Sequence, residues 1–363
     1  MDQFFEYINF PTRISRRNVE LFVFNQNKGR SFSVTPMKES VLPATFRTSL
    51  SMTPRIVSLL PAATEIVCAL DAADSLVGRS HECDWPQNVT HLPVLTAPKI
   101  DPTNSSREID QAIKNSDSDA LFSLNESLLR ELSPDLILTQ SACSICAIDM
   151  DAVANIAASL SLPHGGHPDV LALAPQSLHE LMDDISLVGE KIGKQAEAAE
   201  VVATLNGRIT NVTTETQNIE IEHKKKPRIA LIEWLDPPMS AGNWVPEMIQ
   251  MAGATDALKT NAGKSHWIEW ADVSAADPDI VILIPCGFEL ERVLTEAKTP
   301  AVWPHLKDLR ATREGKLFGV DGHHLFNRPG PRLVDSLEVL AELLYPKSFQ
   351  FEATARFAKR IEA

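Results

Sequence analysis

The chain has 363 residues and a formal net charge of −14 at pH 7, with 44% hydrophobic and 23% charged residues. This length exceeds what one hydrophobic core usually holds, so we expect two α/β units. The acidic balance argues against a nucleic-acid partner, because a phosphate backbone is repelled unless basic residues gather locally. No segment approaches the roughly 20 apolar residues that span a bilayer, so we expect no membrane insertion.

Residues 1–53 differ in composition from the rest of the chain, and we expect them to form a disordered or targeting extension. They are rich in basic and hydroxyl side chains and lack the apolar stretch of a secretory signal. The chain has five cysteines, an odd number, which suggests free thiols in a reducing compartment. These features favour the cytosol or an organelle matrix over the periplasm.

From Arg55 onward, apolar strand patterns alternate with helical patterns, as in a parallel sheet covered on both faces. We expect strands at 55–60, 119–124, 135–139, 170–173, 228–234, 279–284 and 317–320, and helices opening at Pro61, at 245–252 and at 333–344. The two halves also echo each other, since 131–139 parallels 275–283 and 55–59 parallels 228–232. A duplicated α/β lobe follows from this repeat.

The segment between the halves carries the longest helical pattern. Ser177 and Glu180 have the spacing of a capping box, and apolar residues then recur every three or four positions to Val212. We expect one nearly continuous helix over 176–215, with two helices broken near Gly189 or Gly207 as the alternative. The predicted units are 54–175 (N-terminal lobe), 176–226 (connecting helix and linker), 227–346 (C-terminal lobe) and 347–363 (C-terminal tail).

Five motifs point to a known family. They are Arg55–Glu65, Val77–Pro86, Leu132–Gln140, Ala276–Val281 and Asn327–Arg332. With them, the chain from about Arg55 to Pro346 resembles the periplasmic-binding-protein family of vitamin B12 and iron-chelate ABC transporters, and most closely its cobalamin-binding members. The resemblance implies two Rossmann-like lobes joined by one long backbone helix. It also implies a monomer that holds a small-molecule ligand in its cleft, without chemistry of its own, for an ABC transporter permease.

Candidate ligand-binding residues follow from the position of the strands, because ligands bind beyond the carboxyl ends of strands in open α/β sheets. The loops after the predicted strands supply Pro61, Ala62, Thr64, His81, Glu82, Trp85, Gln140, Trp234, Asn243, Trp244, Gly287, Phe288, His323 and Arg328. The aromatic members offer the flat apolar surface that a corrin or porphyrin needs, although each could instead fill a core. His323 could ligate cobalt or iron or merely line a loop. Arg328 could pair with a ligand carboxylate or phosphate or be a surface arginine.

Four cysteines leave a second hypothesis open. Cys83, Cys143, Cys146 and Cys286 all fall in loops expected at the cleft, whereas Cys68 falls inside a helix. If they converge, they could hold zinc or an iron–sulfur cluster, as in an enzyme or a cofactor-assembly protein. If they line the pocket separately, the protein binds a corrinoid and is not an enzyme, which fits the lack of a nucleophile-elbow, Walker or dinucleotide-binding motif. A fold retained for scaffolding, with no ligand, is the third alternative.

Overall fold

The computed structural model describes residues 53–115, 121–140, 150–223, 225–259 and 264–362. The expectations for residues 1–52 and for Cys143 and Cys146 therefore lie outside the described residues. Within the described part, no helix is both long and apolar enough to cross a membrane.

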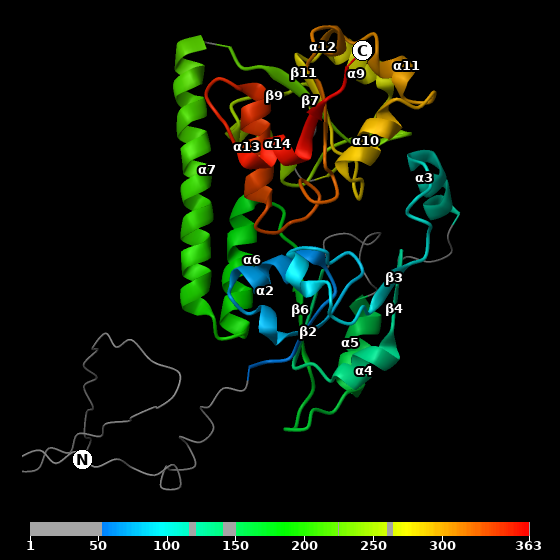
Figure 1. Ribbon diagram of the computed structural model, residues 1–363, viewed down its shortest axis with the longest axis vertical. Coiled ribbons are helices and arrows are strands. Elements are labelled where there is room, and N and C mark those ends of the chain that lie inside the picture. The colour runs from blue at the N-terminus through cyan, green and yellow to red at the C-terminus, as the bar shows by residue number, and fades with distance from the viewer. Residues whose placement is uncertain (1–52, 116–120, 141–149, 224, 260–263, 363) are drawn as a thin grey trace, which may run out of the picture. The chain divides into compact units, whose positions relative to one another are not determined.

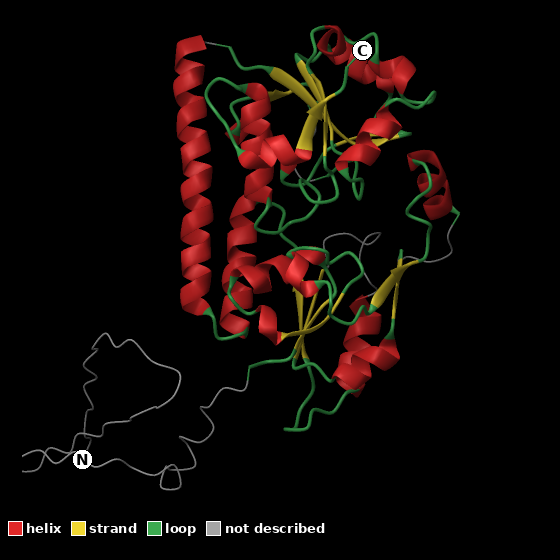
Figure 2. Ribbon diagram, in the orientation of Figure 1, coloured by secondary structure: helices red, strands yellow, loops and turns green. Residues whose placement is uncertain are grey.

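The first lobe is built on a parallel sheet with strand order β2-β1-β5-β6. Its elements in chain order are β1 (Ile56–Ser58), α2 (Pro61–Ala69), β2 (Leu76–Arg79), β3 (Thr96–Pro98), α3 (Ser106–Lys114), β4 (Phe122–Leu124), α4 (Glu126–Leu132), β5 (Leu136–Gln140), α5 (Met150–Ser159) and β6 (Asp169–Leu173). The expected strand at 119–124 is wrong as a member of this sheet, because β4 pairs antiparallel with β3 instead. β1 is buried along its whole length, as expected for a strand covered on both faces (Figure 2).

The second lobe has a mixed sheet with order β10-β8-β7-β11-β12-β13, and β9 also pairs with β7. Its elements are β7 (Arg228–Leu235), β8 (Pro238–Ser240), α8 (Val245–Met251), β9 (Thr255–Asp256), β10 (His266–Trp267), α9 (Trp270–Ala276), β11 (Ile280–Leu283), α10 (Leu290–Ala297), α11 (Trp303–Leu306), α12 (Arg310–Arg313), β12 (Leu317–Val320), α13 (Leu333–Leu344), α14 (Glu352–Phe357) and β13 (Ala358–Arg360). The last residues are no loose tail, since β13 is an edge strand antiparallel to β12.

The internal repeat is visible in matching hydrogen bonds. Asp135 precedes β5, and its carboxylate accepts a hydrogen bond from the backbone N–H of Arg55 at 2.8 Å. Asp279 precedes β11 and accepts the equivalent bond from Arg228 at 2.9 Å. Each aspartate also donates its backbone N–H to the carbonyl of the same arginine. The fold class is thereby confirmed: two α/β lobes of similar construction.

The connection between the lobes consists of two helices, so the expectation of a single nearly continuous helix is wrong. α6 (Leu178–Lys191) and α7 (Gln195–His223) pack against each other as a hairpin, and α7 runs alongside both lobes (Figure 1). Gly193, with a φ of +72°, ends α6. The N–H of Lys194 donates to the carbonyl of Gly189 at 2.7 Å, which is the closing bond of a Schellman motif. The two helices approach so closely that a Cβ on Gly189 would lie 2.5 Å from the Cβ of Ala198.

Candidate functional site

Loops from the carboxyl ends of both sheets meet between the lobes. The loop after β2 carries Glu82, Asp84 and Trp85, and the segment after β12 carries Asp321 to Arg332. Their charged side chains form one network, here named the inter-lobe cluster. Its members are Glu65, Glu82 and Asp84 from the first lobe and Asp321, His323, His324, Arg328 and Arg332 from the second.

Asp84 is the centre of the inter-lobe cluster. Its Oδ2 lies 2.7 Å from Nε2 of His323 and 3.4 Å from Nε2 of His324. The other ring nitrogen of each histidine faces a second carboxylate. Nδ1 of His324 is 3.0 Å from Asp321, and Nδ1 of His323 is 3.6 Å from Glu82. The His324 imidazole is therefore held at both nitrogens, whereas His323 is held at Nε2 and only faces Glu82 through Nδ1.

The electrostatics of the inter-lobe cluster favour charged forms. Burial alone would raise the pKa of Asp84, but hydrogen bonds from the two histidines and Arg328 outweigh it and hold the pKa well below its usual range. Burial would lower the pKa of His324, yet its bonds to Asp321 and Asp84 prevail and raise it to about 9. Asp321 also has a lowered pKa, because bonds from His324 outweigh its burial.

Two arginines hold the lobes together at the base of the inter-lobe cluster. Arg332 is 8% exposed and bonds both oxygens of Glu65, with Nε and Nη2 at 3.0 and 2.6 Å. Arg328 is 6% exposed and donates to Asp84 at 2.6 Å, so the alternative of a surface arginine does not describe it. The lobes touch here, because a Cβ on Gly330 would lie 3.2 Å from the Cα of Ala62.

Trp85 is the predicted aromatic residue that remains half-buried beside the inter-lobe cluster. The guanidinium of Arg332 lies 5.2 Å from its ring centroid, and that of Arg356 lies 5.1 Å away, within cation–π range. Arg356 is exposed and comes from α14, in the segment that sequence reasoning treated as a tail. Phe357, its neighbour, has its ring 5.8 Å from that of His324.

The other predicted aromatic residues lie in the core of the second lobe. Trp234, Trp244 and Phe288 are 9%, 6% and 1% exposed. The indole N–H of Trp244 donates to the carbonyl of Phe326 at 2.7 Å, and that of Trp234 donates to Ser106 at 3.2 Å. The structure therefore places these three rings in the core, which was the alternative to a ligand pocket for each of them.

The remaining predicted residues divide between the lobe contact and the loops. Ala62 and Thr64 are buried at the start of α2, next to half-buried Pro61. His81 bonds Thr96 at 2.6 Å and faces Glu82 at 3.3 Å, on the first-lobe side of the inter-lobe cluster. The predicted positions at other strand ends are half-buried at Gln140 and Asn243 and exposed at Gly287.

Two of the described cysteines, Cys68 and Cys83, do not present a ready thiolate. Cys83 is fully buried, accepts a hydrogen bond from the Thr64 hydroxyl at 3.0 Å, and has a pKa raised to about 11, chiefly by burial. Burial likewise raises the pKa of Cys68 to about 12. Cys286 is exposed on the loop after β11. A protonated, enclosed Cys83 does not support its assignment as a metal ligand.

Helix α3 is a second bridge that sequence reasoning missed. It leaves the first lobe after β3 and reaches the second, where Arg107 forms two bonds to Asp236 at 2.8 and 2.7 Å. The backbone N–H and hydroxyl of Ser106 both donate to Glu296. The spacing of Ser105 and Glu108, a capping box in the structure, was the signal available in the sequence.

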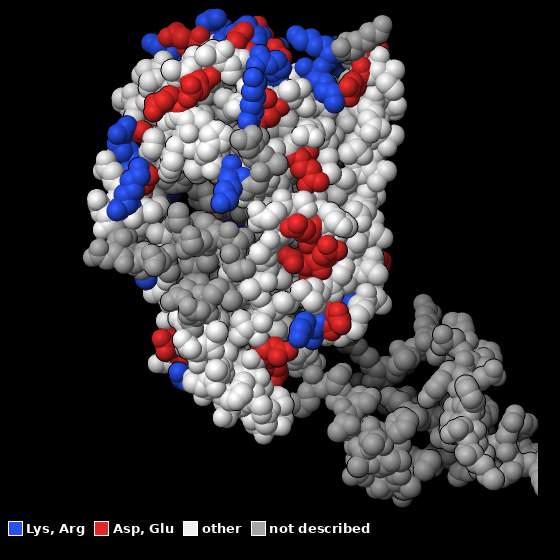
Figure 3. All heavy atoms as spheres, turned by 180° about the vertical axis from the view of Figure 1, so that it is seen from behind, with Lys and Arg blue, Asp and Glu red and all other residues white. Residues whose placement is uncertain are grey.

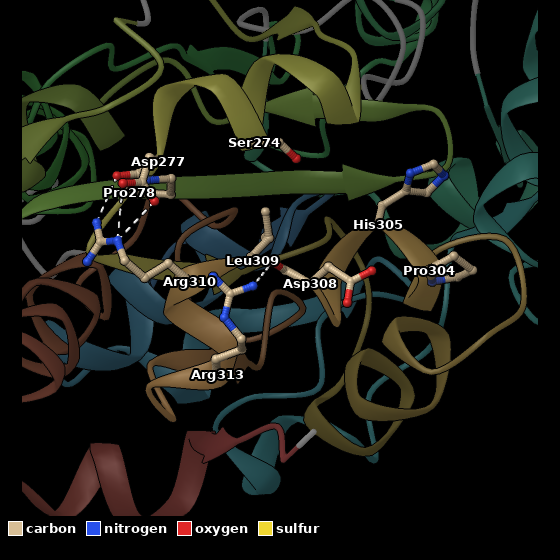
Figure 4. A pocket seen from close by; sticks show the side chains of 9 residues that line it. All are labelled: Ser274, Asp277, Pro278, Pro304, His305, Asp308, Leu309, Arg310 and Arg313. Carbon is tan, nitrogen blue, oxygen red and sulfur yellow. Dashed lines mark hydrogen bonds and ion pairs between the residues drawn. The ribbon is translucent and has the colours of Figure 1, made fainter.

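A cavity of about 340 Å³ lies elsewhere on the second lobe (Figure 4). Its lining includes Asp277 and Pro278, which precede β11, so it opens at the amino ends of the parallel strands, away from the inter-lobe cluster. Arg310 forms an ion pair with Asp277 there.

On the reverse face, the surface is hollowed at mid-height between the lobes, and the described basic and acidic side chains interleave without a continuous basic patch (Figure 3).

Comparison with known proteins decides the family. The family model described as Periplasmic binding protein matches residues 56–322. The chain belongs to this family. An ABC transporter substrate-binding lipoprotein of Bacillus subtilis (strain 168), YvrC, itself uncharacterised, is 22% identical over 298 residues, covering 82% of this chain and 81% of that protein. The family and this relative are described as binding proteins, not as enzymes, and this confirms the expectation of a binding protein.

Solved structures share the fold. A periplasmic heme binding protein from Pseudomonas aeruginosa superposes with a TM-score of 0.65 at 20% identity, covering 86% of this chain and 99% of that one. The periplasmic vitamin B12 binding protein BtuF of Vibrio cholerae gives 0.58 at 16% identity, covering 80% and 96%.

The expected location in the cytosol or an organelle matrix is wrong. The similar proteins are a substrate-binding lipoprotein of an ABC transporter and two periplasmic binding proteins, which points to an extracytoplasmic location. The thiol argument fails for a physical reason. A thiol enclosed like that of Cys83 cannot pair with another cysteine without unfolding, so free thiols of this kind do not report the compartment.

Proposed function

We propose that the protein binds a cobalamin-like corrinoid between its lobes and presents it to an ABC transporter permease. The observation that carries the proposal is the meeting of loops from both sheets around Trp85, Arg332 and Arg356. The Trp85 indole would offer a flat apolar face to a corrin ring once Arg356 leaves it, and the exposed guanidinium of Arg356 suits a phosphate or carboxylate on the periphery of that ring.

The names of similar proteins support the class of ligand. The Vibrio cholerae protein is titled a vitamin B12 binding protein and the Pseudomonas aeruginosa protein a heme binding protein. Both ligands are flat metal chelates. We favour a corrinoid over haem because the motifs Val77–Pro86 and Asn327–Arg332 resemble those of cobalamin-binding members, and these motifs supply Trp85 and the two buried arginines.

Titration of the purified full chain with cyanocobalamin, cobinamide and haem, each followed by absorbance and tryptophan fluorescence, tests the proposal. We expect saturable one-to-one binding of a corrinoid. If haem alone binds, the proposed ligand is wrong and the protein binds a porphyrin. If none of the three binds, the proposal is overturned.

A substitution at Trp85 tests the site itself. Trp85→Ala should weaken corrinoid binding by about 1–3 kcal/mol, or roughly 5- to 150-fold, because a stacking surface is lost. Trp267→Ala is the matched control, since Trp267 is 52% exposed on β10. Trp244 is unsuitable, because its buried indole holds the core and its loss should destabilise the lobe. Equal affinity in the Trp85 and Trp267 variants would contradict the site.

A further inference from the structure

Three side chains of the inter-lobe cluster are arranged like metal ligands. Within the described part of the chain, Asp84, His323 and His324 each offer a ligand atom, and these atoms lie within 4.8 Å of one another. Zinc binds imidazole and carboxylate donors at about 2.0–2.2 Å, so two donors on a tetrahedral ion lie roughly 3.3 Å apart. The contact from Asp84 to His324 already measures 3.4 Å, and that to His323, at 2.7 Å, needs to lengthen by only about half an ångström.

The surroundings of the two imidazoles match those of metal-binding histidines. Such histidines usually direct the nitrogen that does not bind metal toward a carboxylate, which fixes the ring and increases its basicity. Here Nδ1 of His324 lies 3.0 Å from Asp321, and Nδ1 of His323 lies 3.6 Å from Glu82. Asp321 is itself held, since the backbone N–H groups of both histidines donate to its Oδ1 at 3.0 and 2.7 Å.

Charge and donor chemistry also favour a cation at this point. The inter-lobe cluster contains four carboxylates and two guanidiniums, which leaves two negative charges to be balanced by protons on the imidazoles or by a bound cation. Nε2 of His323 lies 2.7 Å from both the Asp84 carboxylate and an Arg328 nitrogen. One ring nitrogen cannot donate to the first and accept from the second at once. An ion between His323 and Asp84 Oδ2 would take the lone pair of Nε2, so Arg328 would keep its bond to Asp84 Oδ1 at 2.6 Å while its other nitrogen moves away from the ring.

We propose that Asp84, His323 and His324 bind a divalent transition-metal ion such as Zn²⁺, which joins the two lobes. Asp84 ligates through Oδ2 and each histidine through Nε2, with Asp321 and Glu82 orienting the rings. Three protein ligands leave a fourth position for water or for a donor atom of a bound molecule. The site is independent of the corrinoid proposal, because it requires no organic ligand.

The test uses untagged full-length protein stripped with a chelator, and measures Zn²⁺ by calorimetry and bound metal by elemental analysis. We expect one Zn²⁺ per chain and a higher melting temperature with the ion, since a ligand of the native state stabilises it. His323→Ala and His324→Ala should each weaken binding more than 10-fold, and Asp321→Asn should weaken it about 10- to 100-fold. His179→Ala is the matched control, because this histidine on α6 has an 85% exposed side chain and should leave binding unchanged.

Cobalt substitution tests the ligand set without any variant that might misfold. Co²⁺ bound by nitrogen and oxygen donors should show visible absorption without a strong near-ultraviolet thiolate band. A thiolate band would assign the ion to cysteines and overturn the proposal, as would no bound Zn²⁺ or full binding by the His323→Ala/His324→Ala double variant. Corrinoid titrations in the presence of the chelator separate the failure of this site from failure of the proposed function.

Discussion

The ion pair between Glu65 and Arg332 should be worth several kcal/mol to the folded protein, because it is enclosed where the lobes meet. Glu65 is 4% and Arg332 is 8% exposed, and the two form a bidentate pair. Removing one partner of such a pair leaves an uncompensated buried charge, which costs about 3–5 kcal/mol. We therefore expect Glu65→Ala to lower the free energy of unfolding by that amount.

A double variant should behave differently. Glu65→Leu combined with Arg332→Met should lose much less stability than the sum of Glu65→Leu and Arg332→Met measured singly, because the double variant leaves no uncompensated buried charge. Lys191→Ala is the control, since its pair with Asp169 has side chains 43% and 66% exposed and should contribute less than about 1 kcal/mol.

Urea unfolding followed by circular dichroism provides the measurement. The m-values of the variants are compared to confirm that each exposes the same amount of surface on unfolding. If Glu65→Ala costs no more than Lys191→Ala, then the lobes do not enclose this pair in solution. Strict additivity in the double variant would likewise refute the reasoning, because it would show that the two side chains do not interact.

Three further predictions concern single positions. Gly193→Ala should destabilise by about 1 kcal/mol because its φ is +72°, whereas Gly207→Ala, exposed within α7, should stabilise by about 0.5–1 kcal/mol in the same urea titration. Asp184→Asn should stabilise by roughly 1 kcal/mol at pH 7 but not at pH 4. Burial raises the Asp184 pKa to about 6 from 3.8, so the native state loses stability as pH rises through that window. Cys83 should resist iodoacetamide at pH 8 until urea unfolds the chain, since it is enclosed with a pKa raised to about 11; rapid native-state labelling in a mass spectrum would refute this.

The sequence could predict the parts of the fold that have continuous apolar patterns. β7 and β11 are buried along nearly their whole length, so their composition alone marks them as central strands. Edge strands such as β10 and β13 have two and three residues, too few for any periodicity. The break between α6 and α7 was visible only as Gly193, whose left-handed conformation decides between one helix and two.

Two positions of the inter-lobe cluster could be named from the sequence, but their partners could not. His323 and Arg328 could be named because they follow a strand, yet Asp84 lies 239 and 244 residues from them. Such pairings depend on how the lobes meet, which no local pattern encodes. The aromatic residues mislead for the opposite reason. A tryptophan at a strand end suits a pocket or a core equally, and the Phe326 carbonyl that receives the Trp244 N–H belongs to a distant loop.

The lobes are joined on both sides of the inter-lobe cluster, with different strengths. The α6–α7 hairpin is a covalent connection with an apolar seam, since Leu205 and Val212 belong to the main core. Helix α3 is attached mainly by hydrogen bonds, with Ile109 packed against the second-lobe core, and in its ion pair the Arg107 side chain is 61% and the Asp236 side chain 11% exposed. Exposed pairs contribute little, whereas apolar seams and buried pairs resist separation. Any opening that admits a ligand should therefore begin at α3, with α7 as the fixed edge and the enclosed Glu65–Arg332 pair as the last contact to part.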